Sequence, residues 1–355
     1  PFNLAAYIYP YLSMIVTNIL ISGLLIFALA ALTRDLLATY LGCIVIIVLY
    51  GIGGSLMSDI NNQTIAAIVD PLGSAAFENI TKYWTVSEKN TQLLPITWHF
   101  IANRLTWLAI VGVVFSIAYR KFQFTQNVFS LKIKKASRTL LAQLQPVFKY
   151  KLIDLPAVTR DFSFRSRLKQ WYSLSKNEFR NIIRNPYFIA IMITAIVMLA
   201  VNAGQIGKMF GTTTFPVTYK VTEMLGDSFY LFMLIIITFY AGELVWRERD
   251  NKLDGIIHSM PIPNWMLYSS KLSALMMLGV FLMLVVMIFG MFVQIFKGYF
   301  NFQPGLYLTE LGINYIDFVL LSILALTIHT IVNNKYAGHF IMVLYFLTDL
   351  FMAQF

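Results

Sequence analysis

Apolar runs of about 20 residues constrain this chain more than any other feature, because a helix of that length spans the hydrocarbon of a bilayer. Charged residues make up 12% of the chain and hydrophobic residues 58%, whereas a soluble domain is about a quarter charged. The runs predict an all-α polytopic membrane protein with about eight transmembrane helices. The expected spans are 11–33, 36–57, 102–119, 186–204, 228–246, 266–296, 312–332 and 337–355.

The chain carries no motif for ATP or metal chemistry. It has no GxxxxGK[ST] phosphate loop, no GxGxxG turn and no HExxH zinc pair, and Cys43 is its only cysteine. We therefore expect no catalytic residue, no metal, no cofactor and no enzymatic activity in this chain. The net charge of +10 favours basic segments beside anionic lipid over a nucleic-acid surface. Because the chain starts at Pro1 and stops inside an apolar run, we expect a piece of a longer polypeptide.

The distribution of lysine and arginine predicts an orientation. Segment 120–185 holds fifteen of the 27 Lys and Arg residues, against three acidic residues. The positive-inside rule places such a segment in the cytoplasm. Counting spans from it also places Arg34, the segment 247–265 and Lys335 on the cytoplasmic side. The loops 58–101, 205–227 and 297–311 are then expected to lie outside.

An internal repeat predicts how the chain is divided. Residues 27–50 resemble residues 322–345 at one constant offset, with a Leu-Ala pair and a Val-Leu-Tyr triplet aligned. Parallel repeats are common in transporters. We expect two copies of one membrane unit. Residues 1–120 would end the first copy with three membrane helices and the outer loop 58–101, residues 121–164 would form a basic cytoplasmic linker, and residues 165–355 would start the second copy with five membrane helices.

Two amphipathic segments fall on the predicted cytoplasmic side. Residues 165–186 separate aromatic and aliphatic side chains from basic ones, which is typical of a helix lying flat in the membrane interface; a solvated linker helix is the alternative. The side chains expected at that interface are Trp171, Lys176, Phe179, Arg180 and Arg184. Residues 247–261 predict a second helix, with Leu253 and Ile256 on its apolar side. Such a helix is either a handle for a soluble partner or a turn that keeps two spans in register.

These features together resemble the permease half of an ABC-2 type exporter. The order is a basic amphipathic helix, two spans, then ERDNKLDGIIHSMP (248–261) and Lys271. The resemblance implies that 165–186 is the elbow helix and that 247–261 is the coupling helix, which docks onto an ABC ATPase subunit holding the ATP. Glu248 and Pro261 fit the family spacing, whereas Lys252-Leu253 replaces the usual Gly-Thr pair. The implied docking residues are Arg247, Glu248, Arg249, Asp250, Asp254 and His258.

A narrower resemblance covers nearly the whole chain. The chain is similar to bacterial permeases that are fused to an M1-type aminopeptidase domain. The motifs that carry this resemblance are DPLG (70–73), YWTVSEKN (83–90), NRLTW (103–107), WRERD (246–250) and PIPNW (261–265). The outer-loop residues concerned are Asp70, Pro71, Gly73, Trp84, Asn90, Asn103 and Arg104. The resemblance implies a peptidase domain beyond Phe355 and a cell inner-membrane location. Within this loop, residues 65–77 are too short and interrupted to span, and they predict a re-entrant or interfacial helix.

Five ionisable residues fall within the apolar runs: Glu243, Asp317, His329, His339 and Asp349. Such groups are costly in a membrane and suggest function by default, but most lie near span ends, where a snorkelling or paired role is expected. The leading hypothesis is the transmembrane subunit of an ATP-driven exporter, with an ABC ATPase and membrane lipid as partners. The alternatives are an anchor for the fused peptidase domain and an ion-coupled secondary transporter. The sequence does not indicate a substrate.

Overall fold

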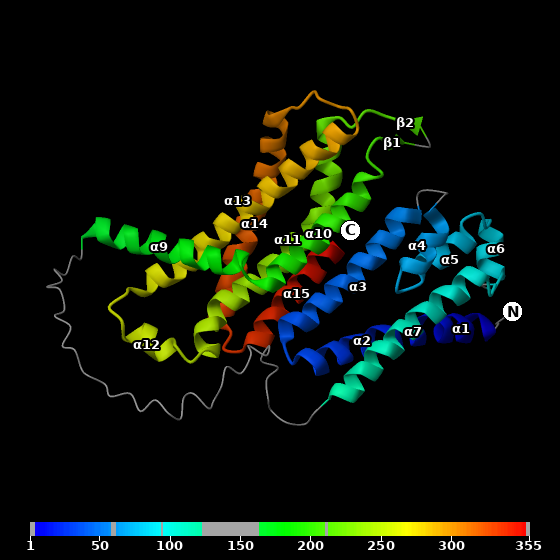
Figure 1. Cartoon of the computed structure of the whole chain (residues 1–355), viewed down its shortest axis with the longest axis horizontal. Coiled ribbons are helices and arrows are strands. Elements are labelled where there is room, and N and C mark those ends of the chain that lie inside the picture. Colours follow the sequence, from blue (N-terminus) through cyan, green and yellow to red (C-terminus); the bar gives the residue numbers. More distant parts are fainter. Residues whose placement is uncertain (1–3, 58–61, 94, 123–162, 210–211, 353–355) are drawn as a thin grey trace, which may run out of the picture.

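The computed structural model describes residues 4–57, 62–93, 95–122, 163–209 and 212–352 as a bundle of long helices (Figure 1). Most of the predicted linker 121–164 lies outside these residues. The first part comprises α1 (Ala5–Pro10), a π-helical turn η1 (Tyr11–Val16), α2 (Thr17–Thr33), α3 (Leu36–Met57), α4 (Gln63–Val69), α5 (Ser74–Thr81), α6 (Val86–Thr91) and α7 (Trp98–Lys121). The second comprises α9 (Phe164–Ile183), α10 (Pro186–Ala203), α11 (Thr218–Asp250), α12 (Asp254–Ser259), α13 (Asn264–Phe296), α14 (Pro304–Ile331) and α15 (Lys335–Met352). Two short antiparallel strands, β1 (Lys208–Met209) and β2 (Thr212–Thr213), pair before α11.

Seven helices in the described part of the chain are long and apolar enough to cross a membrane. They are Ala5–Thr33, Leu37–Met57, Trp98–Lys121, Pro186–Ala203, Thr218–Asp250, Asn264–Phe296 and Pro304–Ile331. The all-α polytopic fold class is thereby confirmed. The eighth predicted span corresponds to α15, which is helical but is not one of the seven.

Several spans begin earlier than their apolar runs predict, and the difference is largest for two of them. Helix α11 starts at Thr218 instead of 228, and α14 starts at Pro304 instead of 312. The added turns carry polar residues, so they extend the helices without extending the apolar run. Pro304 stands in the first turn of α14, a position where its missing N–H costs no intrahelical hydrogen bond.

Helix α11 is the centre of the larger core, which packs α10, α13 and α14 around it. Its buried side chains include Phe229, Phe232 and Ile236. Near the start of α11, Gln294 of α13 donates to the carbonyl oxygen of Pro216 at 3.0 Å and accepts from Tyr307 Oη at 3.0 Å. Burying amide groups stabilises only when they are paired, so this network holds the start of α11 against α13 and α14.

Polar bonds join the first part of the chain to the second along α3 and α10. At one end of this contact, the Tyr187 hydroxyl donates to the Asp35 carboxylate. At the other end, the Ser55 hydroxyl donates to Asn202 Oδ1 at 2.5 Å, and Gln205 Nε2 donates to the Ser55 carbonyl at 2.9 Å. Bonds at both ends of the helix pair fix its register, in addition to its apolar packing.

The two ends of the bundle differ in what they carry. Figure 1 shows α12 and the free end of α9 at one end, and α4, α5, α6 and the β1–β2 pair at the other. We call these the α12 end and the loop end. The predicted outer loops 58–101 and 205–227 contain the short elements of the loop end, and the predicted inner segment 247–265 contains α12. The assignment of the α12 end to the cytoplasm stays a prediction.

Candidate functional site

The segment predicted as one helix over 247–261 is divided into two helices, which corrects that expectation. Helix α11 continues to Asp250, and Lys252 then takes a left-handed conformation with φ of 57°. The amide of Leu253 bonds the carbonyl of Glu248 at 2.9 Å, and the amide of Lys252 bonds that of Arg249 at 3.0 Å. This paired closure satisfies the last carbonyls of a helix and stops it. The short helix α12 follows.

The last four residues of α11 each contact a different neighbouring element. Consecutive side chains on an α-helix point about 100° apart, so four of them cover all sides. Arg247 Nη2 lies 2.5 Å from Glu178 Oε2 on α9, and Glu248 Oε1 lies 2.9 Å from Lys271 Nζ on α13. We call Arg247, Glu248, Arg249 and Asp250 the hub.

The other two hub residues reach the α14–α15 connection. Arg249 Nη1 donates to Asn333 Oδ1 at 3.0 Å, and Asp250 Oδ2 lies 2.7 Å from Lys335 Nζ. The same ammonium lies 3.5 Å from Glu243, which precedes Asp250 by about two turns of α11. The hub therefore ties α11 to α9, α13 and the start of α15.

The hub contacts differ in strength because they differ in burial. The side chains of Glu248 and Lys271 are only 16% and 12% exposed, and that of Glu178 is 11% exposed. Removing one member of such a pair leaves a poorly solvated charge and costs several kcal/mol, roughly 3–5 for a fully buried pair. The Asp250 side chain is 50% exposed, and a pair of that kind is worth about 1 kcal/mol or less.

The structure thus brings four of the six sequence-predicted docking residues together, but directs them to other parts of the same chain. Asp254 is exposed on α12 and lines a small cavity with Glu248 and Lys271, without an ion pair of its own among the described residues. The side chain of His258 lies outside the described atoms. The same segment also carries exposed apolar side chains. Leu253, Ile256 and Met260 are 45%, 62% and 42% exposed, so the α12 segment presents a mixed surface to its surroundings.

Helix α9 packs on α13 with part of the face predicted to lie in the membrane interface. Trp171 Nε1 donates to Ser269 Oγ at 3.0 Å, and the Phe179 and Phe281 rings lie 6.4 Å apart. Trp171 and Phe179 therefore also pack within the protein, while their place at the membrane interface stays a prediction. The basic residues expected beside them, Lys176, Arg180 and Arg184, are exposed.

Glu178 is the functional candidate that sequence reasoning missed. It is the only acidic residue of α9 and is buried against Arg247. A lone carboxylate among the five basic side chains of α9 was the available signal, but the sequence does not show which of the chain's charges it pairs with.

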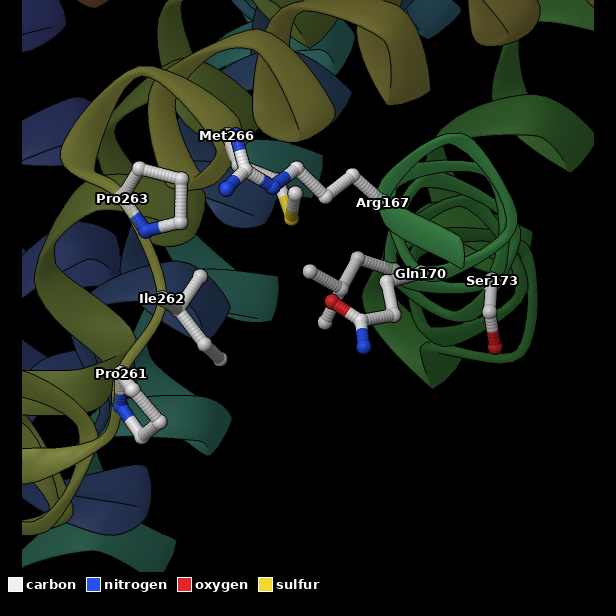
Figure 2. Close-up of a pocket in the computed structure, with 8 residues that line it drawn as sticks. Arg167, Gln170, Ser173, Pro261, Ile262, Pro263 and Met266 are labelled. Atoms are coloured by element: carbon white, nitrogen blue, oxygen red, sulfur yellow. The ribbon is translucent and has the colours of Figure 1, made fainter. Parts of the chain in front are cut away.

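A cavity of about 700 Å³ separates α9 from the segment that follows α12. Figure 2 shows the side chains of Arg167 and Gln170 extending from α9 toward Pro263, Ile262 and Met266 on the other wall. One wall therefore offers a cation and an amide, and the other offers apolar groups. The cavity and α12 lie at the same end of the bundle and together form the candidate contact surface.

The predicted outer-loop residues gather at the loop end, where α7 holds α4 and the turn after it. Helix α4 ends at Val69 and leaves its last carbonyls without intrahelical partners. Asn103 Nδ2 donates to the carbonyls of Ala67 and Asp70, both at 2.7 Å, and Trp107 Nε1 donates to that of Ile68 at 3.0 Å. Unpaired carbonyls in a membrane cost several kcal/mol each, so these bonds let a short helix end inside the bundle.

The turn itself is held by Asp70 and Arg104. The Asp70 carboxylate accepts from the amides of Leu72 at 2.9 Å and Ala75 at 2.7 Å, which caps α5. Arg104 Nη2 donates to the Leu72 carbonyl at 2.7 Å, and Gly73 has φ of 73°. We call Asp70, Gly73, Asn103 and Arg104 the loop-end knot. The predicted re-entrant helix over 65–77 is therefore two short helices joined by a turn.

Of the remaining outer-loop residues, Pro71 is buried beside the knot, whereas Trp84 and Asn90 are not part of it. Trp84 precedes α6, and Asn90 lies exposed within it. Helix α6 starts with a capping box, in which Thr85 and Glu88 bond each other's backbone amides. Hydrogen bonds from Thr85 lower the pKa of the Glu88 carboxyl below its usual value. Trp84 and Asn90 thus remain predicted outer-loop residues without a described role in the knot.

A tightly packed pair of histidines joins α11, α14 and α15 next to the hub. The His329 and His339 rings lie 4.7 Å apart and are 1% and 5% exposed. A Cβ at Gly338 would overlap the His329 ring.

We expect Gly338→Ala to destabilise the protein by about 1–3 kcal/mol, as overpacking of a core does. Thermal unfolding in detergent measures this, with Gly312→Ala as the control, since no atom lies within 4 Å of a Cβ there. Equal melting temperatures for the two variants would refute it.

The comparisons with known proteins bear on the second part of the chain. Residues 174–348 match the family model described as ABC-2 family transporter protein. The match supports an ABC-2 type permease, and with the seven apolar helices it supports a multi-pass membrane protein. The ABC-2 match covers the hub, α12 and the helices α10 to α14. No curated protein and no solved structure matches the chain.

Proposed function

We propose that this chain is the transmembrane permease of an ATP-driven exporter in the cell inner membrane. A separate ABC ATPase subunit would bind ATP and drive it through the segment 247–261. The observation that carries the proposal is the hub, which lies directly before the exposed α12 and ties α11 to α9, α13 and the α14–α15 connection through residues within the ABC-2 match region. Only a short turn joins α12 to α11, so a force applied at α12 is passed to α11, the central helix of the core.

Movement follows if the ATPase binds two permease conformations with different affinity, since a ligand shifts an equilibrium only by such a difference. The exposed apolar side chains of α12 and the cavity beside α9 are the surfaces offered to the ATPase. The hub charges then act behind that surface, where they transmit the movement to α9, α13 and α15.

The domain division stays part of this proposal. Residues 1–120 would complete a first permease copy, and 165–355 would begin the second. The fused M1-type peptidase also stays a prediction, and so does the alternative in which the spans only anchor it. An ion-coupled secondary transporter would instead need transport that persists without ATP.

Substitution on α12 tests the proposal directly. We expect Ile256→Glu to reduce co-purification of a phosphate-loop ATPase by at least about tenfold, because it places a charge in an apolar contact at the centre of an interface. The measurement is the amount of that ATPase, identified by mass spectrometry, recovered per mole of tagged chain after mild solubilisation.

The control for this test is Phe300→Glu. Phe300 is similarly exposed, at 68% against 62% for Ile256, but lies at the loop end, between α13 and α14. The control should retain the ATPase. Co-purification that is the same with both variants, or no ATPase bound to the unmodified chain, would contradict coupling through α12 and favour the anchor.

A further inference from the structure

An apolar groove of about 590 Å³ lies between α3, α11 and α15. It is separate from the hub and from the cavity beside α9. Its walls come from both the first and the second part of the chain, with Tyr40 and Cys43 from α3, Phe239 from α11 and His339 and Phe340 from α15. A cavity of this size accommodates a small organic molecule.

Aromatic rings from all three helices meet in the wall of this groove. The Tyr40 and Phe239 ring centroids are 4.8 Å apart, and each lies 6.0 Å from the His339 ring. The face of an aromatic ring is electronegative, so it attracts a cation that has shed its water. Tyr336 and Phe340 add further rings to the same wall.

His339 supplies a polar group that the fold leaves unused. Its side chain is 5% exposed, and its Nδ1 has no hydrogen-bond partner among the described residues. A buried polar atom without a partner costs free energy, and a positively polarised group of a ligand in the groove would remove that cost.

The charges around the groove do not oppose a cation. No lysine or arginine is among the described residues that line it. The ammonium of Lys335, adjacent in sequence to the lining residue Tyr336, is bound by two carboxylates, at 2.7 Å from Asp250 and 3.5 Å from Glu243. A positive ligand therefore meets no uncompensated positive charge there.

An acidic cavity of about 410 Å³ lies on the same face of α11, nearer the loop end. Glu223, Asp227 and Tyr230 line it from α11, and Glu310 lines it from α14. Positions 223, 227, 230, 234 and 238 recur every three or four residues, which places them along one face of a helix. The last two of these belong to the groove. Along one face of α11, from its start toward the hub, the carboxylates therefore precede the apolar and aromatic wall of the groove.

We propose that the groove binds a lipophilic organic cation and that this class of molecule is what the permease exports. The second half of the statement rests on the proposed function. The aromatic wall binds the apolar body and the positive charge together, and the carboxylates of Glu223, Asp227 and Glu310 attract the cation toward the loop end. An anion of the same size gains nothing from either section.

Two ions of the same shape and opposite charge test the proposal. Purified full chain in nanodiscs should bind tetraphenylphosphonium at least about tenfold more tightly than tetraphenylborate, after subtraction of binding to empty nanodiscs. We expect Phe239→Leu to weaken phosphonium binding by about tenfold, the size of a cation–π contact in a desolvated site. Phe292→Leu removes a ring of α13 that is 55% exposed, and it should bind like the unmodified chain.

Tyr40→Leu, on a different helix, should also weaken phosphonium binding and replaces Phe239→Leu if that variant does not fold. Equal affinity for the two ions, a preference for the borate, or unchanged phosphonium binding in both ring variants would each overturn the proposal. Binding in nanodiscs needs no ATPase. Lost cation preference with intact ATPase co-purification therefore refutes this inference alone, whereas retained cation binding without an ATPase partner refutes the proposed function alone.

Discussion

Glu178→Arg is expected to destabilise the protein by about 2–3 kcal/mol and to uncouple the ATPase. The variant places a second cation against Arg247, whose only described acidic partner is Glu178. Loss of one member of a fully buried pair costs about 3–5 kcal/mol, and the 27% exposure of the Arg247 side chain reduces that figure. Thermal unfolding in detergent measures the first effect. ATP turnover of the co-purified complex, relative to the unmodified one, measures the second.

A double variant in which the two charges are exchanged distinguishes loss of the ion pair from other consequences of the Glu178 substitution. Glu178→Arg combined with Arg247→Glu restores opposite charges at the same place and should recover most of the stability and the turnover. Asn177→Arg is the matched control, because residue 177 is exposed on the same helix and should change neither quantity. If the exchanged pair behaves no better than Glu178→Arg alone, the contact between α9 and the hub does not carry the coupling.

Gly73→Ala is expected to lower the free energy of unfolding by about 3 kcal/mol or more. Ala costs about 1 kcal/mol in the left-handed conformation that Gly73 adopts, and its methyl group would overlap the Arg104 guanidinium. Arg104 would then lose its bonds to Asn18 Oδ1 and the Leu72 carbonyl, both 2.7 Å long. Each such charged bond is worth about 1.5–3 kcal/mol.

The control for the knot is Gly112→Ala in α7. No atom lies within 4 Å of a Cβ at Gly112, so the substitution should be neutral or stabilising by up to about 1 kcal/mol through helix propensity. Thermal unfolding in detergent compares the two variants. We expect Gly73→Ala to melt roughly 5 °C lower or more, and similar melting temperatures would show that the knot does not stabilise the loop end.

Features carried by one continuous stretch of sequence were predictable. The long apolar helices follow from hydropathy because a span is a local property of about 20 residues. Helix α9 follows from the 3.6-residue period of its apolar side chains. The extra turns of α11 and α14 were missed because residues 218–227 and 304–311 are too polar to count as a span, although helix propensity and packing continue the helix.

Pairings between distant residues were not predictable. The hub charges were expected to face a partner protein, whereas Arg247 pairs with Glu178, which is 69 residues away. The local sequence around either residue does not indicate that the two pair. The loop-end residues were grouped only by resemblance. The physical reason for this grouping is that backbone carbonyls at the end of α4 and in the turn after it need hydrogen-bond donors. Asn103, Arg104 and Trp107 supply these donors from α7, which only the structure shows.

The arrangement of the hub restricts how α11 can move. Tethers on several sides of its final turn resist torque, since any rotation about the helix axis would stretch at least two ion pairs at once. At the hub itself, movement along the axis meets less restraint, because long side chains such as Lys271 and Lys335 can follow a small shift while they keep their partners. We therefore expect a push on α12 to be delivered to the membrane core as sliding of α11 rather than as twisting.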